Sequence, residues 1–264
     1  AEMRIGQVQA ALFIFPLLLG PFPVFAQRDV APPMGMGLSG VSAYGSVWQF
    51  VDMMKHSREW RARKDWEDWT IIEDEFGWPV SLRHKDKTEA EIDGNHPIFM
   101  YNYYRRIAGD VVLTWEGDGV VSLRGNKITP KEDEFPQRKR RVYTFAENDG
   151  GVFDLVVSRS NPEDHVRNIH MWMPGFENSG ETFHPLWKKV IEPFPYFRFM
   201  DWGGTNNSQQ KEWSDRKTIR HMRQTGGVAY EYMIQLCNEM EKDAWICIPH
   251  MATDNYVRQL GKLI

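Results

Sequence analysis

The period of the apolar positions changes along this chain and divides it into two main parts. Between about residues 96 and 160 apolar residues recur with a period of two, and turn residues such as those at 148–150 separate the apolar runs. This pattern predicts strands over 96–106, 109–125, 139–146 and 150–160. The second of these is predicted to be a hairpin that turns at residues 116–119, and the last two are predicted to pair with each other. Short strands with this spacing predict an antiparallel β-sandwich or jelly roll over residues 96–165.

From about residue 166 to Ile264, apolar runs alternate with segments of helical period. The runs predict strands at 167–175, 196–202 and 244–250, and the periodic segments predict helices at 185–194, 226–243 and 254–264. One face of the second helix is apolar and consists of Val228, Tyr232, Met233, Leu236, Cys237 and Met240. This alternation predicts parallel strands covered by helices, because each crossover must span the sheet and return. We therefore predict about three units of a partial TIM-type (β/α) barrel over residues 166–264, which makes the fold class α/β plus all-β.

Residues 1–26 have the pattern of a secretory signal peptide. Arg4 precedes an apolar stretch at 10–20, and a small-residue cleavage pattern ends at Ala26. The stretch is too short and too interrupted by proline for a membrane span. The sequence therefore predicts a secreted or periplasmic protein with no membrane contact after cleavage, and an irregular lead-in with one short helix over residues 27–95.

Charge and composition exclude some partners and favour others. A formal net charge of −4 and a pI near 6.1 give no long-range attraction to nucleic acid or to an anionic membrane. The chain has 11 tryptophans, and flat sugar rings stack on tryptophan, although large aromatic residues also fill protein cores. Trp60, Trp66, Trp69 and Trp78 are interpreted either as an exposed sugar platform or as a clamp onto the domain behind them.

Motifs of metal and cofactor chemistry are missing from the sequence. The two cysteines, Cys237 and Cys247, have no CxxC spacing, and they are predicted to be either a bridge between consecutive elements or two free thiols. Neither an HExxH helix nor a GxSxG elbow occurs, and the Gly-rich stretch at 35–40 does not follow a strand. We therefore expect no metal and no cofactor.

Three segments carry a resemblance to a known family: RNIHMWMPGFENSGETFHPLW (167–187), RFMDWGGTNNSQQKEWSDR (198–216) and GGVAYEYMIQLCNEMEKDAWICIPHMATDNYVRQL (226–260). They resemble secreted bacterial proteins often labelled cellulose- or carbohydrate-binding, whose C-terminal region is similar to the (β/α)8 barrel of clan-A-type retaining glycoside hydrolases. In that clan a following strand carries an Asn-Glu pair with the acid/base, and a later strand carries the nucleophile. This sequence ends before either, so the resemblance implies a truncated chain that is catalytically incomplete.

Ligands of parallel sheets bind beyond the carboxyl ends of the strands, and polar or aromatic residues follow each predicted strand here. The predicted substrate-binding residues are Glu177, Arg198, Asp201, Trp202, Trp213 and His250, and no residue is assigned a catalytic role. Each also has a structural interpretation. Asp201 could brace the glycine turn that follows it, Trp202 could cover the top of the barrel, and His250 could be a hydrogen-bonded structural residue.

The remaining three candidates are open in the same way. Arg198 lies inside a strand, where it must find a carboxylate or project into the site. Trp213 could either stack on a sugar or form the small core of its own loop. Glu177 could act as a general acid only with a partner carboxylate.

The leading functional hypothesis is a piece of a secreted, glycoside-hydrolase-like protein that acts on plant or microbial polysaccharide. The alternative is a non-catalytic carbohydrate-binding protein, with the predicted sandwich and the tryptophans making the contact. A third hypothesis is an outer structural or adhesion protein that uses the same fold, because a fold does not determine a function. The expected partner is a polysaccharide or an oligosaccharide in the first two cases.

Overall fold

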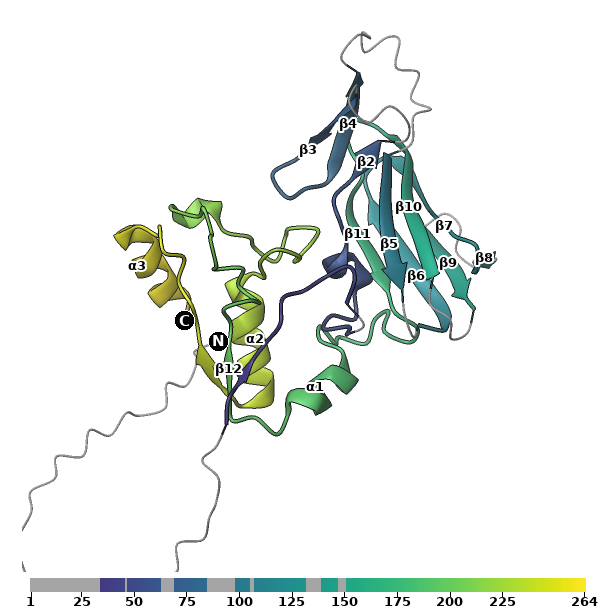
Figure 1. Ribbon diagram of the computed structural model, residues 1–264. Coiled ribbons are helices and arrows are strands. Elements are labelled where there is room, and N and C mark those ends of the chain that lie inside the picture. The colour runs from purple at the N-terminus through teal and green to yellow at the C-terminus, as the bar shows by residue number, and fades with distance from the viewer. Residues whose placement is uncertain are drawn as a thin grey trace, which may run out of the picture.

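The computed structural model describes residues 34–45, 47–62, 69–84, 98–104, 107–131, 139–146 and 151–264. In this part of the chain the structure has two lobes, one made of antiparallel sheets and one made of helices around a small parallel sheet (Figure 1). We call them the sheet lobe and the helical lobe. The predicted signal peptide at residues 1–26 lies outside the described residues.

The sheet lobe consists of two four-stranded antiparallel sheets around one hydrophobic core. The first sheet has the order β2 (Arg61–Ala62), β5 (Ile98–Tyr104), β10 (Gly151–Ser160), β7 (Gly119–Arg124). The second has the order β11 (Arg167–Trp172), β6 (Gly109–Glu116), β9 (Arg140–Phe145), β8 (Ile128–Lys131). Alternate residues of a strand enter the core, such as Leu113 in β6 and Leu155 in β10, because successive side chains point to opposite faces. The lobe also draws on residues outside 96–165, since β2 and β11 belong to its sheets.

The two predicted hairpins of this lobe are wrong, because each pair of consecutive strands is divided between the two sheets. This holds for β6 with β7 and for β9 with β10. At the corner between β6 and β7 the amide of Asp118 donates to the carbonyl of Asp164 (2.6 Å). A Cβ atom on Gly117, whose φ is 82°, would lie 1.9 Å from the carbonyl oxygen of His165. The corner is therefore tied to the neighbouring connection between β10 and β11, which also crosses between the sheets.

A separate hairpin of β3 (Trp69–Glu73) and β4 (Pro79–His84) packs beside the sheets. Trp60 and Trp78 are buried in the core of the sheet lobe, and the indole nitrogen of Trp60 donates to the carbonyl of Gly77 in the hairpin turn (2.9 Å). These two tryptophans are clamps rather than an exposed platform. The side chains of Trp66 and Trp69 lie outside the described part of the structure.

The helical lobe contains a parallel sheet with the order β1 (Met36–Gly37), β12 (Tyr196–Arg198), β13 (Asp243–Trp245). Its helices are α1 (Pro185–Ile191), α2 (Tyr230–Met240) and α3 (Asp254–Leu263). The apolar face of α2, with Met233 and Leu236, packs into a core that also holds Phe197 and Trp202. A second core therefore exists beside that of the sheet lobe.

The prediction of a partial TIM-type barrel over residues 166–264 is wrong. The described residues contain no closed barrel and no repeated βα pattern. The segment predicted as the first parallel strand is β11, which pairs antiparallel with β6 in the sheet lobe, and the strand beside β12 is instead β1. In β11, Ile169 and Met171 face the core, while His170 and Trp172 face away from it. This alternation is typical of an antiparallel strand with one covered face, whereas barrel strands are covered on both faces.

Residues 47–60 connect the two lobes, and we call this segment the lobe connection. The sequence predicted one short helix in the lead-in at 27–95, and in the described residues 47–60 only the short 3-10 helix η1 (Met53–His56) forms. Phe50 belongs to the core of the helical lobe, whereas Met53 and Met54 belong to the core of the sheet lobe. The apolar residues of this segment, which have helical spacing, are therefore divided between two different cores. Figure 1 shows this purple segment running from β1 to η1 and on to β2.

Candidate functional site

A cavity of about 470 Å³ lies on the outer face of the second sheet, beneath the loop between β11 and α1. Its lining combines aromatic with hydrogen-bonding side chains: Thr114, His170, Trp172, Phe176, Glu177, Asn178, Gly180, Glu181 and Thr182. A cavity of this volume falls within the range of small-molecule sites in proteins. We call it the β11 cavity.

A row of side chains crosses three strands of the second sheet, and two of its members, Thr114 and His170, line the β11 cavity. His170 lies opposite Thr114, and Thr114 lies opposite Arg140, so all three point away from the core. The guanidinium of Arg140 then donates from Nε and Nη2 to the two carboxylate oxygens of Glu177 (both 2.7 Å). This two-pronged contact fixes the position of Glu177 over the sheet.

Turns hold the loop above the cavity in shape. Three of its residues have a left-handed backbone: Gly175 (φ 83°), Asn178 (φ 63°) and Gly180 (φ 76°). Glycine adopts this conformation at little cost, and asparagine adopts it more readily than most other residues. The amide of Phe176 donates to the carbonyl of Met173, and the amide of Val51 in the lobe connection donates to Thr182 (3.1 Å). Contacts within the protein therefore fix the conformation of the loop without a ligand.

A buried carboxylate orients His170. The carboxylate of Asp52 accepts a hydrogen bond from the amide of Met54 and thereby caps η1, and it also accepts one from the amide of Met171 (both 3.0 Å). Its second oxygen lies 2.8 Å from Nδ1 of His170. Burial alone would raise the pKa of Asp52, but the hydrogen bond and charge of His170, together with Lys55, outweigh it and lower that pKa. An ionised Asp52 therefore holds Nδ1, which leaves Nε2 as the ring nitrogen available to the cavity.

The aromatic part of the cavity is a stacked pair. The rings of His170 and Trp172 are 5.0 Å apart and nearly parallel, at 16°. They are two residues apart on one strand, which places both on the same face. The arrangement offers a flat aromatic surface beside the hydrogen-bonding groups of Glu177, Asn178 and Glu181.

Of the six predicted substrate-binding residues, Glu177 lines the β11 cavity and the other five lie in the helical lobe. Trp202 has 0 % of its surface exposed and contacts the rings of Phe50, Trp187 and Phe199. It cannot stack on a sugar in this structure, so that role is corrected to one in the core. The sequence indicated a strand-end position because Trp202 does follow β12, but the residue turns into the space between β12, α1 and the lobe connection.

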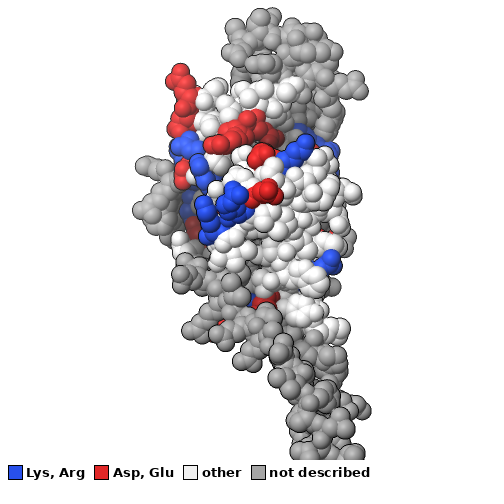
Figure 2. All heavy atoms as spheres, turned by 90° about the vertical axis from the view of Figure 1, so that its left-hand side faces the viewer, with Lys and Arg blue, Asp and Glu red and all other residues white. Residues whose placement is uncertain are grey.

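The other four residues surround the parallel sheet without sharing one cavity. Arg198 lies over the ring of Trp245 (5.3 Å), and Trp213 stacks on Tyr230 (6.3 Å, 3°). Asp201 and His250 are exposed in the loops after β12 and β13. On the face of this lobe that carries α3, acidic and basic side chains lie next to each other (Figure 2). This part of the surface has no extended field of one sign.

A polar cavity of about 460 Å³ does lie in the loop after β12. Its lining, as far as the structure describes it, is Gly204, Asn206, Asn207, Ser208, Gln209, Gln210, Asp215 and Gly226. No aromatic side chain belongs to this lining, and none of the six predicted residues does. It therefore offers hydrogen bonds but no stacking surface.

Sequence reasoning missed His170, Trp172 and Asp52. A signal for the first two was present, because they alternate with Ile169 and Met171 in a segment that was interpreted as a doubly buried strand. No comparable signal exists for Asp52, which is 118 residues away from its partner His170. Such a contact depends on how the lobe connection runs.

The described residues contain no group of three or more His, Cys, Asp or Glu side chains that could hold a metal ion. Within the same residues, no helix has the length and apolar character needed to span a bilayer. Cys237 and Cys247 are both free thiols, which answers the question of a bridge between them.

No protein-family model, curated sequence or solved structure matches the chain. The arrangement of the β11 cavity therefore carries the functional argument.

Proposed function

We propose that this protein binds a polysaccharide or oligosaccharide at the β11 cavity without cleaving it. The observation that carries the proposal is the lining of the cavity, in which Trp172 and Phe176 lie beside Glu177, Asn178 and Glu181. A sugar ring has an apolar face of C–H groups and a rim of hydroxyl groups. The aromatic side chains suit the face, and the carboxylate and amide groups suit the rim.

Preorganisation of the cavity supports the same function. Arg140 fixes Glu177, Asp52 orients His170, and backbone turns fix the loop that carries Asn178. A binding site that already has its bound shape loses less conformational entropy when a ligand enters. The conformational cost of binding a sugar is therefore low on the protein side.

Binding receives more support than hydrolysis. Retaining hydrolysis requires two carboxyl groups about 5–5.5 Å apart, one of which must hold and transfer a proton. Two carboxylates belong to the described lining of the β11 cavity, and both are engaged with cations, Glu177 with Arg140 and Glu181 with Lys188 (2.9 Å). Engaged carboxylates suit acceptors of hydroxyl hydrogen bonds. The barrel that would have supplied a glycosidase site is also absent from the described residues.

Replacing Trp172 with alanine is expected to weaken sugar binding by about tenfold or more, because the aromatic stacking surface is lost. The first measurement is retention of the protein on insoluble cellulose, xylan, mannan and chitin. The second is the dissociation constant for a soluble oligosaccharide of the polysaccharide that retains it, cellohexaose in the case of cellulose, obtained by titration calorimetry.

The matched control is Trp245→Ala, which removes an indole that is 55 % exposed on the other lobe. This variant should bind like the unmodified protein. Thermal unfolding of both variants shows whether either has lost its structure. Retention on none of the four polysaccharides would overturn the proposal, and so would a Trp172→Ala variant that is folded and binds undiminished.

A further inference from the structure

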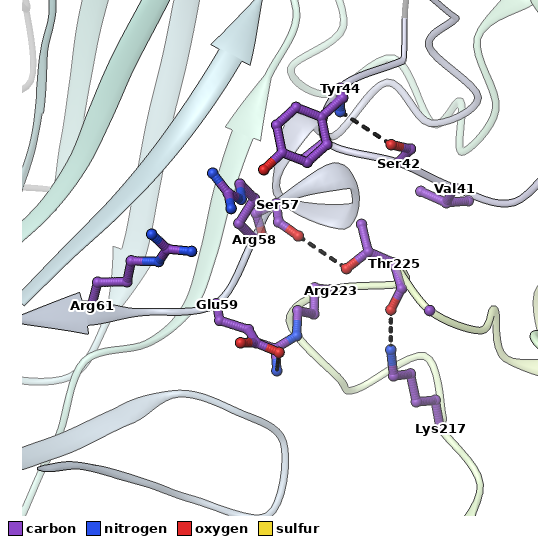
Figure 3. Close-up of a pocket in the computed structure, with 12 residues that line it drawn as sticks. Val41, Ser42, Tyr44, Ser57, Arg58, Glu59, Arg61, Lys217, Arg223 and Thr225 are labelled. Carbon is purple, nitrogen blue, oxygen red and sulfur yellow. Dashed lines mark hydrogen bonds and ion pairs between the residues drawn. The ribbon is translucent and has the colours of Figure 1, made fainter. Parts of the chain in front are cut away.

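A third cavity, of about 390 Å³, lies where the lobe connection meets the loop between η4 (Trp213–Asp215) and α2 (Figure 3). Residues 41–44, 57–59 and Arg61 line one side, and Lys217, Arg223, Thr225 and Gly226 line the other. The two sides are joined by hydrogen bonds from the amide of Gln224 to the carbonyl of Lys55 (2.8 Å) and from the hydroxyl of Thr225 to the carbonyl of Ser57 (3.0 Å). The walls are thus held together independently of any ligand.

Positive charge dominates this cavity. As far as the structure describes it, the lining contains four cationic side chains, Arg58, Arg61, Lys217 and Arg223, and one carboxylate, Glu59. Figure 3 shows Arg58 coming from the lobe connection, Arg61 from the start of β2, and Lys217 and Arg223 from the opposite loop. This excess contrasts with the net negative charge of the whole chain.

The nearby carboxylates give the guanidinium of Arg223 only some of the hydrogen-bond acceptors that it needs. Its Nη2 lies 3.7 Å from the carboxylate of Glu59, which is beyond hydrogen-bond length. Its Nη1 is buried and has no hydrogen-bond partner among the described residues. Glu73 also interacts with the charge of Arg223 but does not line the cavity. A buried donor without a partner is costly, and an incoming acceptor would remove that cost.

The surroundings of Lys217 also disfavour its positive charge. Its ammonium donates to the carbonyl of Thr225. Burial and the neighbouring charge of Arg223 lower the pKa of Lys217 to about 8. Cations that repel each other in a partly enclosed space are stabilised when an anion enters between them.

We propose that this cavity binds a sulfate or phosphate group carried on a larger molecule. Arginine is suited to such groups because its planar guanidinium can donate two parallel hydrogen bonds to a pair of oxyanion oxygens. The cavity is larger than an inorganic oxyanion needs, so its remaining space accommodates the molecule that bears the group. The ring of Tyr44, which lies 4.7 Å from the guanidinium of Arg58, offers an apolar wall for that part. The inference does not depend on the β11 cavity.

The experiment titrates the full chain with glucose 6-sulfate and glucose 6-phosphate, and separately with inorganic sulfate, inorganic phosphate and glucose. Calorimetry at low ionic strength is suitable because salt screens the attraction. At least one ester should bind, and it should bind more tightly than both the corresponding inorganic anion and glucose. The two esters distinguish a sulfated from a phosphorylated ligand.

Variants locate the binding. Arg223→Gln should weaken the ester by about tenfold or more, because it removes the charge and the forked donor. Arg258→Gln, which removes an exposed cation of α3 and changes the net charge equally, should leave the affinity unchanged. If Arg223→Gln does not fold, Arg58→Gln tests the opposite wall. Trp172→Ala should bind the ester normally, so failure here and failure of sugar binding at the β11 cavity can be told apart.

Three results would overturn the inference. They are the absence of binding to either ester at millimolar concentration, equal affinity for the ester and the free anion, and equal loss in the Arg223→Gln and Arg258→Gln variants. The last would show a response to net charge rather than to this cavity.

Discussion

Replacing Trp202 with alanine is expected to lower the free energy of unfolding by about 3–5 kcal/mol, the cost of removing a large aromatic residue from a protein core. The indole is fully buried, and its ring stacks on Phe50 with an interplanar angle of 4°. Phe50 comes from the lobe connection. Of the neighbouring rings, Phe183 comes from the loop before α1 and Trp187 comes from the start of α1. Truncation therefore opens a cavity at the point where three segments meet.

Denaturant titration followed by circular dichroism measures this loss. Trp245→Ala is the matched control, since its exposed indole should contribute less than about 1 kcal/mol. Trp202→Phe should cost less than the alanine variant, because the indole N–H has no hydrogen-bond partner among the described residues. A loss below about 1 kcal/mol for Trp202→Ala would contradict the core position and restore Trp202 as a candidate for the surface.

Lowering the pH from about 6.5 to 4 is expected to destabilise the protein by up to about 3 kcal/mol through His56 alone. Burial lowers the pKa of His56 from 6.5 to about 4. Its Nε2 accepts a hydrogen bond from the amide of Phe50 (3.1 Å), and protonation of that nitrogen would break the bond. The folded state therefore favours neutral His56, and the stabilisation is complete above pH 6.5 and is lost as the pH falls toward 4.

The measurement is the free energy of unfolding at several pH values for the unmodified protein and for His56→Gln. The pKa values of His184 and His221 are also lowered by burial, so the difference between the two proteins isolates His56. The pKa of Asp52 beside it is lowered from 3.8, so this carboxylate stays ionised in the same window. Identical pH dependence in both proteins would show that His56 does not titrate as a buried base.

The positions of the strands could be predicted from the sequence better than their pairing. The segments of β6, β7, β9 and β10 fall inside the predicted strand ranges, because a period of two is a local property. Pairing failed because it depends on distant contacts: Gly117 approaches His165 and thereby turns a predicted hairpin into a corner between sheets. The prediction of a barrel was wrong for a related reason, because β11 could be assigned to a sheet only by knowing that it lies beside β6.

The site shows the same limit. Glu177 was among the predicted binding residues and lines the β11 cavity, but its partner Arg140 is 37 residues away and belongs to another strand. Trp202 was predicted to bind substrate, with a structural role at the top of the barrel as the alternative, because it follows a predicted strand. Nothing local in the sequence shows that Phe50 covers it. Residue types that suit a sugar could thus be recognised in the sequence, whereas the cavity that assembles them depends on the path of residues 47–60 between the lobes.

Hydrogen–deuterium exchange with and without a saturating oligosaccharide tests the central claim most directly. Protection should appear in residues 168–182 and in β6, which form the β11 cavity, while the loops at 199–215 and 246–253 should exchange at unchanged rates. Trp172→Ala should abolish the protection at an oligosaccharide concentration that saturates the unmodified protein. Protection confined to the loops after β12 and β13, with residues 168–182 unaffected, would contradict the account and return the site to the residues around Asp201 and His250.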